Sequence, residues 1–369
     1  MLYYLAEYIN NTFNPPGFDL FRFITWRSAL AALTSMIISF WIGPKIVKYL
    51  NKKSVADEIR DDGPQSHLVK AGTPTMGGIM IILAVLIPVL LWGDLKNTYI
   101  LLIIIATVWM GLVGFIDDYL KVFKKMKKGL VAKYKLMNQA GLGIVIACLI
   151  YFLPEFKDIN SVTTIPFIKQ LEFDFSYLYL PIMVFIIMAT SNAVNLTDGL
   201  DGLAIGCVGI AGLALGIIAY LSGNEIFSRY LNIIYLPGNG ELAVYCSALV
   251  GASLGFLWFN SYPAQVIMGD TGSLALGGAI GTLSILVKKE FLLPILGGIF
   301  FAESLSVIAQ RYYFKYTKKK YGEGRRILRM APVHHHFELE GIAEPKIVIR
   351  FYIIAVILAI LTFATFKIR

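Results

Sequence analysis

The stretch Leu-Tyr-Leu-Pro-Ile-Met-Val-Phe-Ile-Ile-Met-Ala-Thr-Ser-Asn-Ala-Val-Asn-Leu-Thr-Asp-Gly-Leu-Asp-Gly, residues 178–202, joins an apolar run to a group of carboxylates. Its first part is apolar enough and long enough to cross a bilayer, which takes about 17–25 residues. Its last part places Asn195, Asp198 and Asp201 at the end of that run. Carboxylates beside hydrocarbon are costly and are usually functional, so this junction predicts a membrane protein with a chemical site at the membrane surface.

The composition extends this interpretation to the whole chain. Of the 369 residues, 57% are hydrophobic and 15% are charged, whereas a soluble globular protein carries about 25% charged residues. Apolar runs recur throughout, so we expect one polytopic domain, 1–369, with an all-α integral membrane fold and no separate soluble domain. About ten transmembrane helices are predicted, at 21–44, 75–93, 98–116, 137–153, 178–194, 203–222, 241–259, 272–287, 291–312 and 347–366.

The distribution of lysine and arginine predicts which loops face the cytoplasm. The loops at 45–70, 121–135 and 311–346 hold about twice as many of these residues as the opposite loops and tails, and positively charged loops stay inside. An even number of spans then makes both termini extracytoplasmic. The Asp-rich segments all fall on the cytoplasmic side, although they were not used in the assignment. We therefore expect a single cytoplasmic active-site cleft.

The extracytoplasmic loops are predicted to carry little chemistry. Residues 155–177 partly alternate polar and apolar side chains, which favours a short periplasmic β-hairpin. Residues 223–240 predict a short amphipathic helix. In the ninth span, Pro294, Gly297 and Gly298 predict a bend that opens a groove toward lipid.

Three acidic motifs are the candidate catalytic groups. Asp117 and Asp118 end the third span, Asp198 and Asp201 follow the fifth, and Asp270 opens the eighth. Oxygen ligands of this kind suit Mg²⁺ better than zinc. A charged helix end, an Asx-rich turn and a helix N-cap are the structural alternatives for the three motifs in turn. The helix N-terminus beside Asp270 favours an anionic phosphate. A Mg²⁺ held by Asp270 could in turn hold that phosphate, so we favour a metal ligand over an N-cap at this position.

Two other segments have candidate binding residues. Lys70-Ala-Gly-Thr-Pro-Thr-Met-Gly-Gly78 contains small residues that let backbone donors approach an anion, with Lys70 and Thr75 as contacts, although it is not a Walker sequence. His334-His335-His336 lies in the longest basic loop. Three adjacent histidines cannot all point into one site, so one or two of them are expected to hydrogen-bond phosphate or sugar.

Two features have a structural interpretation of equal or greater weight. The basic run 121–135 suits anionic lipid headgroups as well as it suits a substrate. Glu303 lies well inside the ninth span, where a buried polar contact between helices is favoured over a catalytic role.

Together these motifs resemble the polyprenyl-phosphate N-acetylhexosamine-1-phosphate transferase superfamily over essentially the whole chain. The likeness rests on Asn195-Leu-Thr-Asp-Gly-Leu-Asp-Gly-Leu203, on Pro263-Ala-Gln-Val and the following Met-Gly-Asp-Thr-Gly-Ser-Leu-Ala-Leu-Gly-Gly278, and on Ala331-Pro-Val-His-His-His-Phe-Glu338. The last stretch is similar to the signature of the phospho-N-acetylmuramoyl-pentapeptide transferases. One departure is Ile267, where the family usually has a phenylalanine expected to stack on uracil. This residue shifts the expected base recognition toward hydrogen bonds and backbone contacts.

The resemblance implies a reaction. UDP-N-acetylmuramoyl-pentapeptide would give its phospho-sugar-peptide to undecaprenyl phosphate, with release of UMP and formation of lipid I for peptidoglycan. It also implies Mg²⁺ dependence, a homodimer in the bacterial cytoplasmic (inner) membrane, contact with membrane lipids, and no nucleic-acid partner. Two mechanisms stay open: Asp117 or Asp118 removes the acceptor's proton for direct attack, or a carboxylate attacks first and forms a covalent intermediate. Direct attack is favoured, because the acceptor phosphate is already nucleophilic near neutral pH.

The matching motifs also imply roles for individual residues. Asp270 is the expected metal ligand, and the expected catalytic set is Asp117, Asp118, Asp198, Asp270, His334 and His335. The expected substrate-binding set is Lys70, Thr75, Lys121, Lys125, Lys133, Asn195, Asp201, Asn260, Gly269, Gln310 and Ala331. One rival is a sister enzyme that uses UDP-N-acetylglucosamine, against which the three histidines argue. The other is an ion-coupled transporter, whose sites would lie near mid-membrane.

Overall fold

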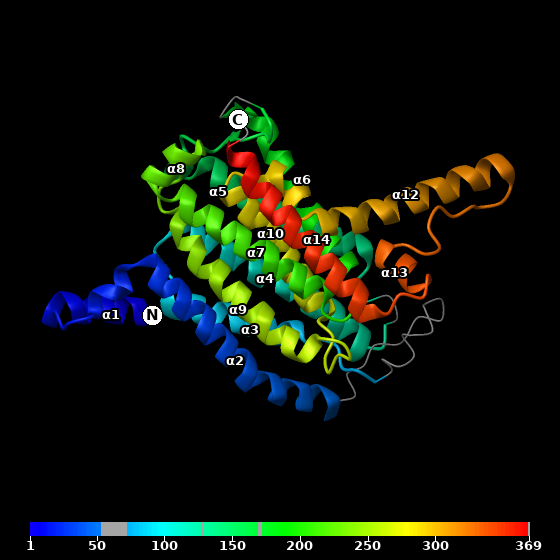
Figure 1. Cartoon of the computed structure of the whole chain (residues 1–369), viewed down its shortest axis with the longest axis horizontal. Coiled ribbons are helices and arrows are strands. Elements are labelled where there is room, and N and C mark those ends of the chain that lie inside the picture. Colours follow the sequence, from blue (N-terminus) through cyan, green and yellow to red (C-terminus); the bar gives the residue numbers. More distant parts are fainter. Residues whose placement is uncertain (53–71, 127–128, 169–171, 368–369) are drawn as a thin grey trace.

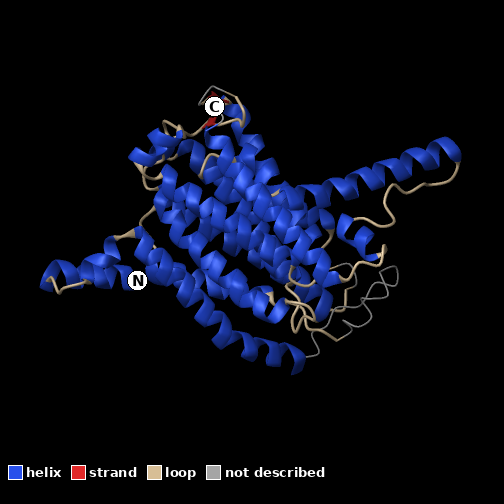
Figure 2. Ribbon diagram, viewed as in Figure 1, coloured by secondary structure: helices blue, strands red, loops and turns tan. Residues whose placement is uncertain are grey.

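The computed structural model describes residues 1–52, 72–126, 129–168 and 172–367. Within these residues the chain is almost entirely helical, with one small two-stranded sheet (Figures 1 and 2). The helices are α1 (Leu2–Phe13), α2 (Ile24–Lys52), α3 (Gly78–Trp92), α4 (Thr98–Val122), α5 (Ala132–Phe152), α6 (Tyr179–Thr197), α7 (Leu203–Ser222), α8 (Glu225–Leu231), α9 (Leu242–Asn260), α10 (Gly269–Leu286), α11 (Leu293–Leu296), α12 (Gly298–Tyr321), α13 (Val333–Glu338) and α14 (Glu344–Ala364). The strands are β1 (Val162–Thr163) and β2 (Phe173–Asp174).

The predicted spans coincide with helices. Among the described residues, seven helices are long and apolar enough to cross a membrane, and α11 with α12 would make an eighth if the bent pair is one span. The other two predicted spans correspond to α3, which has only 15 residues, and to α10, which is rich in glycine. The all-α integral membrane fold is confirmed, and the number of ten crossings stays a prediction.

Helix α10 forms the centre of the bundle. It packs against α3, α4, α6 and α7, and every residue from Thr271 to Leu286 is buried. Glycines allow this close packing, since a Cβ at Gly277 would lie 2.6 Å from the Cα of Ser191. Small residues let membrane helices approach closely and gain van der Waals contact. The helix that begins with the Asp270 motif is therefore held firmly by its neighbours.

The loops at the end of α10 remote from Asp270 form a packed cap. The antiparallel pair β1–β2 confirms the hairpin predicted within 155–177, and α8 confirms a short helix within 223–240. Beneath the hairpin the Lys288 ammonium is buried and donates to the Tyr179 hydroxyl at 3.4 Å. Burial lowers the pKa of Lys288 to about 8. The cap is thus held by buried polar contacts, and it lies away from the three acidic motifs.

The ninth predicted span is bent at Gly297, as its proline and glycines predict. Helices α11 and α12 meet at 83°, and α12 projects from the bundle (Figure 1, orange). The chain then folds back along α12 into the short α13 and enters α14. This return brings the histidine-rich segment back to the bundle.

Candidate active site

Three carboxylates from two helices meet at one end of the bundle. Asp117 and Asp118 lie near the end of α4, and Asp270 lies in the first turn of α10. One oxygen of each carboxylate lies within 4.8 Å of an oxygen of the others. The helices come this close at Gly114, where a Cβ would lie 2.1 Å from the Asp270 carbonyl oxygen. Packing therefore joins two motifs that are far apart in the sequence.

The buried Asp118 carboxylate accepts hydrogen bonds from the start of α10. Its Oδ1 accepts from the Asp270 amide at 3.0 Å, and its Oδ2 accepts from the Thr271 amide at 2.8 Å and hydroxyl at 2.6 Å. The first amides of a helix have no partner within the helix, and the helix dipole favours a negative charge there. Asp118 thus acts as a cap supplied by another helix, and both of its oxygens are occupied.

The carboxylates of Asp117 and Asp270 share two lysines. The Lys121 ammonium lies 2.7 Å from Asp117 Oδ2 and 2.5 Å from Asp270 Oδ2. The Lys135 ammonium, from the first turns of α5, lies 3.1 Å from Asp270 and 3.7 Å from Asp117. Asp117 Oδ1 also accepts from the Leu130 amide at 2.7 Å. This pair of carboxylates and pair of ammoniums form the charged centre of the site.

Asn195 links the Asp198 motif to Asp270. Its amide nitrogen donates to the Asp270 carboxylate and lies 3.1 Å from the Ser273 hydroxyl. Ser273 in turn donates to the Gly269 carbonyl at 3.0 Å. Asn195 therefore bonds Oδ1 of Asp270, while the two lysines bond Oδ2.

The segment before α3 pairs with the segment before α10. The Ile267 amide donates to the Pro74 carbonyl at 2.8 Å, and the Gly77 amide donates to the Ile267 carbonyl at 2.9 Å. A Cβ at Gly269, whose φ is 73°, would lie 2.8 Å from the buried Thr75 hydroxyl and 2.7 Å from Asp118 Oδ2. Thr75 and Gly269 thus lie at the carboxylates, whereas Lys70 lies outside the described residues.

Asp201 and Asn260 hold the loops that surround the site. Asp201 Oδ2 accepts from the Ala264 amide at 3.0 Å, and the Asp201 amide donates to Glu344 at 2.6 Å. Asn260 Oδ1 accepts from the Gly202 amide at 3.0 Å. Both side chains are buried. Asp198 caps the end of α6 and stays half-buried.

The three histidines have different surroundings. His334 is fully buried, its Nδ1 lies 3.1 Å from the Glu303 carboxylate, and its Nε2 would lie 2.2 Å from a Cβ at Gly199. His335 is half-buried and its Nδ1 lies 2.7 Å from Glu338. His336 Nδ1 accepts from the Arg329 amide at 3.2 Å. The segment therefore joins α12 to the Asp198 turn through His334.

The remaining predicted residues form none of the contacts described above with the carboxylates, and one of them hydrogen-bonds backbone groups of the returning loop. Gln310 accepts from the amides of Ile327 and Leu328 at 3.0 Å each and donates to the Leu328 carbonyl at 3.0 Å. Its polar atoms therefore hold the returning loop. Lys125 and Lys133 are exposed before and at the start of α5, and Ala331 is half-buried just before α13.

Sequence reasoning missed Lys135, Thr271 and Ser273. Thr271 and Ser273 stand inside the Met-Gly-Asp-Thr-Gly-Ser motif, where hydroxyls beside the aspartate were an available signal. Lys135 belongs to the basic run, and its selection over Lys133 depends on where α5 begins. The sequence alone offered no signal for that choice.

The donor set fits a divalent cation such as Mg²⁺. The site offers carboxylate oxygens from three aspartates, with an amide and two hydroxyls beside them, and hard cations prefer such oxygen ligands. Asp118 is occupied as a helix cap, so Asp117 and Asp270 are the carboxylates that can turn toward an ion. The ammoniums of Lys121 and Lys135 lie against these carboxylates, so a bound ion would have to displace them from some of the carboxylate oxygens.

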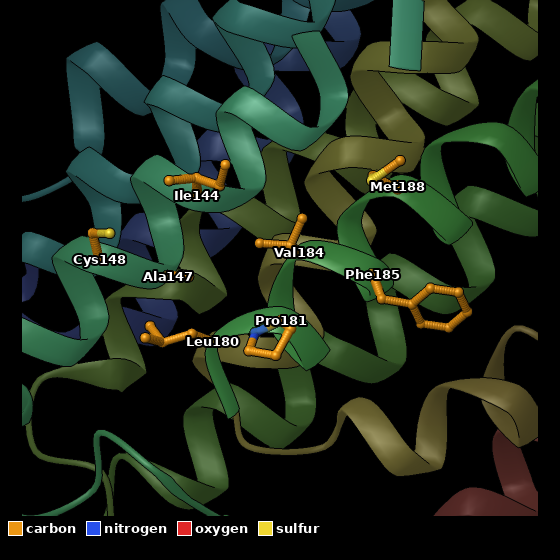
Figure 3. Close-up of a pocket in the computed structure, with 8 residues that line it drawn as sticks. All are labelled: Ile144, Ala147, Cys148, Leu180, Pro181, Val184, Phe185 and Met188. Carbon is orange, nitrogen blue, oxygen red and sulfur yellow. The ribbon is translucent and has the colours of Figure 1, made fainter. Parts of the chain in front are cut away.

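A hollow of about 440 Å³ lies between α5 and α6 and is lined by apolar side chains (Figure 3). Its lining includes Cys148, Leu180 and Phe185, and no charged group. Such a surface suits hydrocarbon chains, and it contributes no group to the carboxylate cluster. The groups suited to catalysis are therefore those of the polar cluster.

Comparisons with known proteins find similarity along the full length. Residues 100–288 match Glycosyl transferase family 4, and residues 70–82 match phospho-N-acetylmuramoyl-pentapeptide-transferase signature 1. Proteins named phospho-N-acetylmuramoyl-pentapeptide-transferase from Chlorobium phaeobacteroides and Chloroherpeton thalassium are 52% and 51% identical over 369 residues, which cover all of both chains. The protein of that name from Flavobacterium johnsoniae is 48% identical over 410 aligned residues, again with all of both chains covered.

Proposed function

The chain belongs to the phospho-N-acetylmuramoyl-pentapeptide-transferase family, and we propose that it makes lipid I for peptidoglycan. In this reaction UDP-N-acetylmuramoyl-pentapeptide gives its phospho-sugar-peptide to undecaprenyl phosphate, and UMP leaves. The observation that carries the proposal is the identity of 52% over the whole chain. The lysine–carboxylate cluster on a membrane helix bundle supplies the chemistry, since two anionic reactants must meet at a lipid surface.

We propose Mg²⁺ as the cofactor, with Asp270 as the principal ligand and Asp117 beside it. When bound, Mg²⁺ would offset the charge of the donor pyrophosphate and of the leaving phosphate. Asn195 would fix one oxygen of Asp270, and Asp118 would keep the first turn of α10 in place. The three clustered carboxylates support this assignment.

The two lysines would bind substrate phosphates. Lys121 and Lys135 each form ion pairs with both Asp117 and Asp270. A phosphate bound at these carboxylates would therefore lie within a short movement of either ammonium. Asp117 would accept the acceptor's proton, since its carboxylate does not cap a helix, whereas both oxygens of Asp118 do. Direct attack of the acceptor phosphate on the donor's β-phosphate then needs no covalent enzyme intermediate.

We place the protein in the bacterial inner membrane, as a multi-pass homodimer with the site facing the cytoplasm. The lysine-rich loops support this orientation. A nucleotide donor made in the cytoplasm and a lipid acceptor can meet only at that face. The chain would act as one domain, because its helices share one buried core.

A reconstituted assay tests the proposal. Purified protein with UDP-N-acetylmuramoyl-pentapeptide, undecaprenyl phosphate and Mg²⁺ should release UMP, and chelation of the metal should stop the release. Asp270→Asn should abolish turnover while the thermal unfolding temperature stays close to that of the wild type. Release of UMP from UDP-N-acetylglucosamine instead would assign the sister activity. Substrate flux across vesicles without UMP would indicate a transporter.

A further inference from the structure

The inner face of α12 is covered by the returning chain. Gln310 holds Ile327 and Leu328, and Thr317 accepts from the Arg325 amide at 2.8 Å. At 100° per residue, Glu303, Gln310 and Thr317 point in the same direction, because they are seven residues apart. Thr317 is the one buried residue in the outer half of α12. This face therefore has its partner within the chain.

The opposite face of α12 has no covering segment among the described residues. The side chains of Phe301, Leu305, Ile308, Tyr312 and Tyr316 follow one another at spacings of three and four, which keeps them on one stripe. Their exposed fractions are 48%, 46%, 49%, 72% and 57%. This stripe lies about 180° from the loop-bearing face. An exposed stripe this long on a projecting helix needs an environment that accepts it.

The chemical character of the stripe changes along the helix. It is aliphatic and aromatic near the bundle, carries tyrosines in its middle, and continues into Lys315 and Lys319 at its tip. The segment 311–329 holds eight Lys and Arg residues and one acidic residue. The Lys320 ammonium lies 5.6 Å and 5.3 Å from the rings of Tyr316 and Tyr321. Hydrocarbon, then tyrosine, then lysine is the order met on leaving a bilayer core for its headgroups.

We propose that the outer end of α12 is a binding surface for anionic phospholipid headgroups, with Lys315 and Lys319 as the contacts. The bend at Gly297 turns α12 away from the other helices, so that the stripe can lie in lipid while the lysines reach the surface. Basic side chains beside an anionic leaflet each strengthen binding severalfold. An acidic protein partner would match the lysines but would leave the apolar part of the stripe unexplained.

The same contact would influence the active site. One face of α12 would bind lipid while the other holds the returning loop through Gln310, so an anchored α12 fixes the chain that leads to α13. His334 of α13 is packed between Glu303 and the Asp198 turn. Anionic lipid should therefore raise the transfer rate. This consequence rests on the proposed function, whereas the binding itself does not.

Photolabelling tests the binding without turnover. The protein is placed in phosphatidylcholine nanodiscs that lack polyprenyl phosphate and contain a trace of phosphatidylglycerol with a photoreactive headgroup, or the matching phosphatidylcholine probe. We expect the anionic probe to label residues 312–321 several times more than the neutral probe, with a preference that falls as salt is added. Lys315→Gln/Lys319→Gln should reduce the labelling by the anionic probe to the level of the neutral probe. The control Lys48→Gln/Lys52→Gln removes two exposed lysines from the end of α2 and should leave the labelling of α12 unchanged.

The outcomes separate the two proposals. Equal labelling by both probes would overturn the proposed headgroup-binding surface. It would show that α12 is immersed in lipid without distinguishing headgroups, and it would favour an acidic protein as the partner of the lysines. A preference that survives in Lys315→Gln/Lys319→Gln would overturn it as well. A clear preference in a protein that releases no UMP would uphold the surface and reject the enzyme. In an active protein, the rate should rise with the phosphatidylglycerol fraction in the wild type and stay flat in the double variant.

Discussion

Asp117 and Asp118 are neighbours in the sequence, but their carboxylates have different partners. Successive residues on a helix point about 100° apart, so Asp118 turns toward the amides of α10 and Asp117 turns toward the two lysines. A carboxylate with both oxygens bound to a helix start is poorly placed to take a proton. At the scale of single residues, the structure thus gives the two carboxylates different surroundings, which supports Asp117 as the proposed proton acceptor.

The prediction that follows concerns stability. In Asp118→Asn one oxygen becomes an NH₂ group that faces the amide of Asp270 or Thr271, so a donor meets a donor. We expect a loss of about 1–3 kcal/mol, seen as a lower thermal unfolding temperature in detergent, together with loss of UMP release. Asp117→Asn should lose UMP release with a smaller change in stability, since both lysines keep Asp270. An Asp118→Asn protein that is inactive but as stable as the wild type would show that Asp118 acts on the substrate.

Gly199 offers a second test at this scale. A Cβ there would lie 2.2 Å from His334 Nε2, a distance that real side chains do not tolerate, so Gly199→Ala must displace the imidazole. We expect its transfer rate to fall as far as that of His334→Ala. Gly141→Ala is the control, because its Cβ would meet only Trp109 at 3.7 Å. Wild-type rates for Gly199→Ala would mean that the position of His334 is unimportant to the reaction.

The residues that sequence reasoning found and missed differ in a physical way. Asp117, Asp118 and Asp270 could be selected because a carboxylate at the end of an apolar run is costly and is seldom retained without a function. Lys135 could not be selected over Lys133, since both are lysines in one basic run and only the start of α5 turns one of them inward. Tertiary contacts also decide that Gln310 binds backbone.

At the scale of elements, α12 and its returning loop form a unit that apolar periodicity alone did not reveal. The bend before α12 was predictable, because Pro294 and two glycines mark it in the sequence. The fold-back was not predictable, because it depends on Gln310 and Thr317 binding amides seventeen and eight residues farther on, respectively. The spans themselves were predictable, since their apolar runs are long and continuous.

We expect Gln310→Ala to release the returning loop. It removes the acceptor of two amides and the donor to one carbonyl, which together hold Ile327 and Leu328 against α12. Limited trypsin digestion should then cut faster at Arg325, Arg326 and Arg329, and the transfer rate should fall. The helix bundle should keep its thermal stability. Ser306→Ala is the matched control on α12, since the Ser306 hydroxyl donates to the Glu303 carbonyl of its own helix. Equal digestion of the wild type and Gln310→Ala would show that Gln310 does not hold the returning loop.

At the scale of the whole molecule, the distribution of charge supports the proposed orientation in the membrane. Lys121 and Lys135 lie at the carboxylates, and α13, which belongs to the basic segment 311–346, lies on the opposite side of the bundle from α8 (Figure 1). The proposed reaction uses a nucleotide made in the cytoplasm, so it requires that the carboxylates face the cytoplasm. The proposed site therefore requires the proposed topology. The orientation in the membrane can be measured independently of activity.

Single-cysteine labelling makes that measurement. Lys125→Cys lies in the exposed loop that follows α4, and Tyr230→Cys lies on α8, where the native side chain is 69% exposed. A membrane-impermeant maleimide added to spheroplasts should label position 230 at once and position 125 only after the membrane is permeabilised. The background should be low, because Cys207 and Cys246 are buried and Cys148 lines the apolar hollow between α5 and α6. Labelling of position 125 from outside would place the lysines and carboxylates where no cytoplasmic nucleotide can reach them, and the proposed reaction would be excluded whatever the family resemblance.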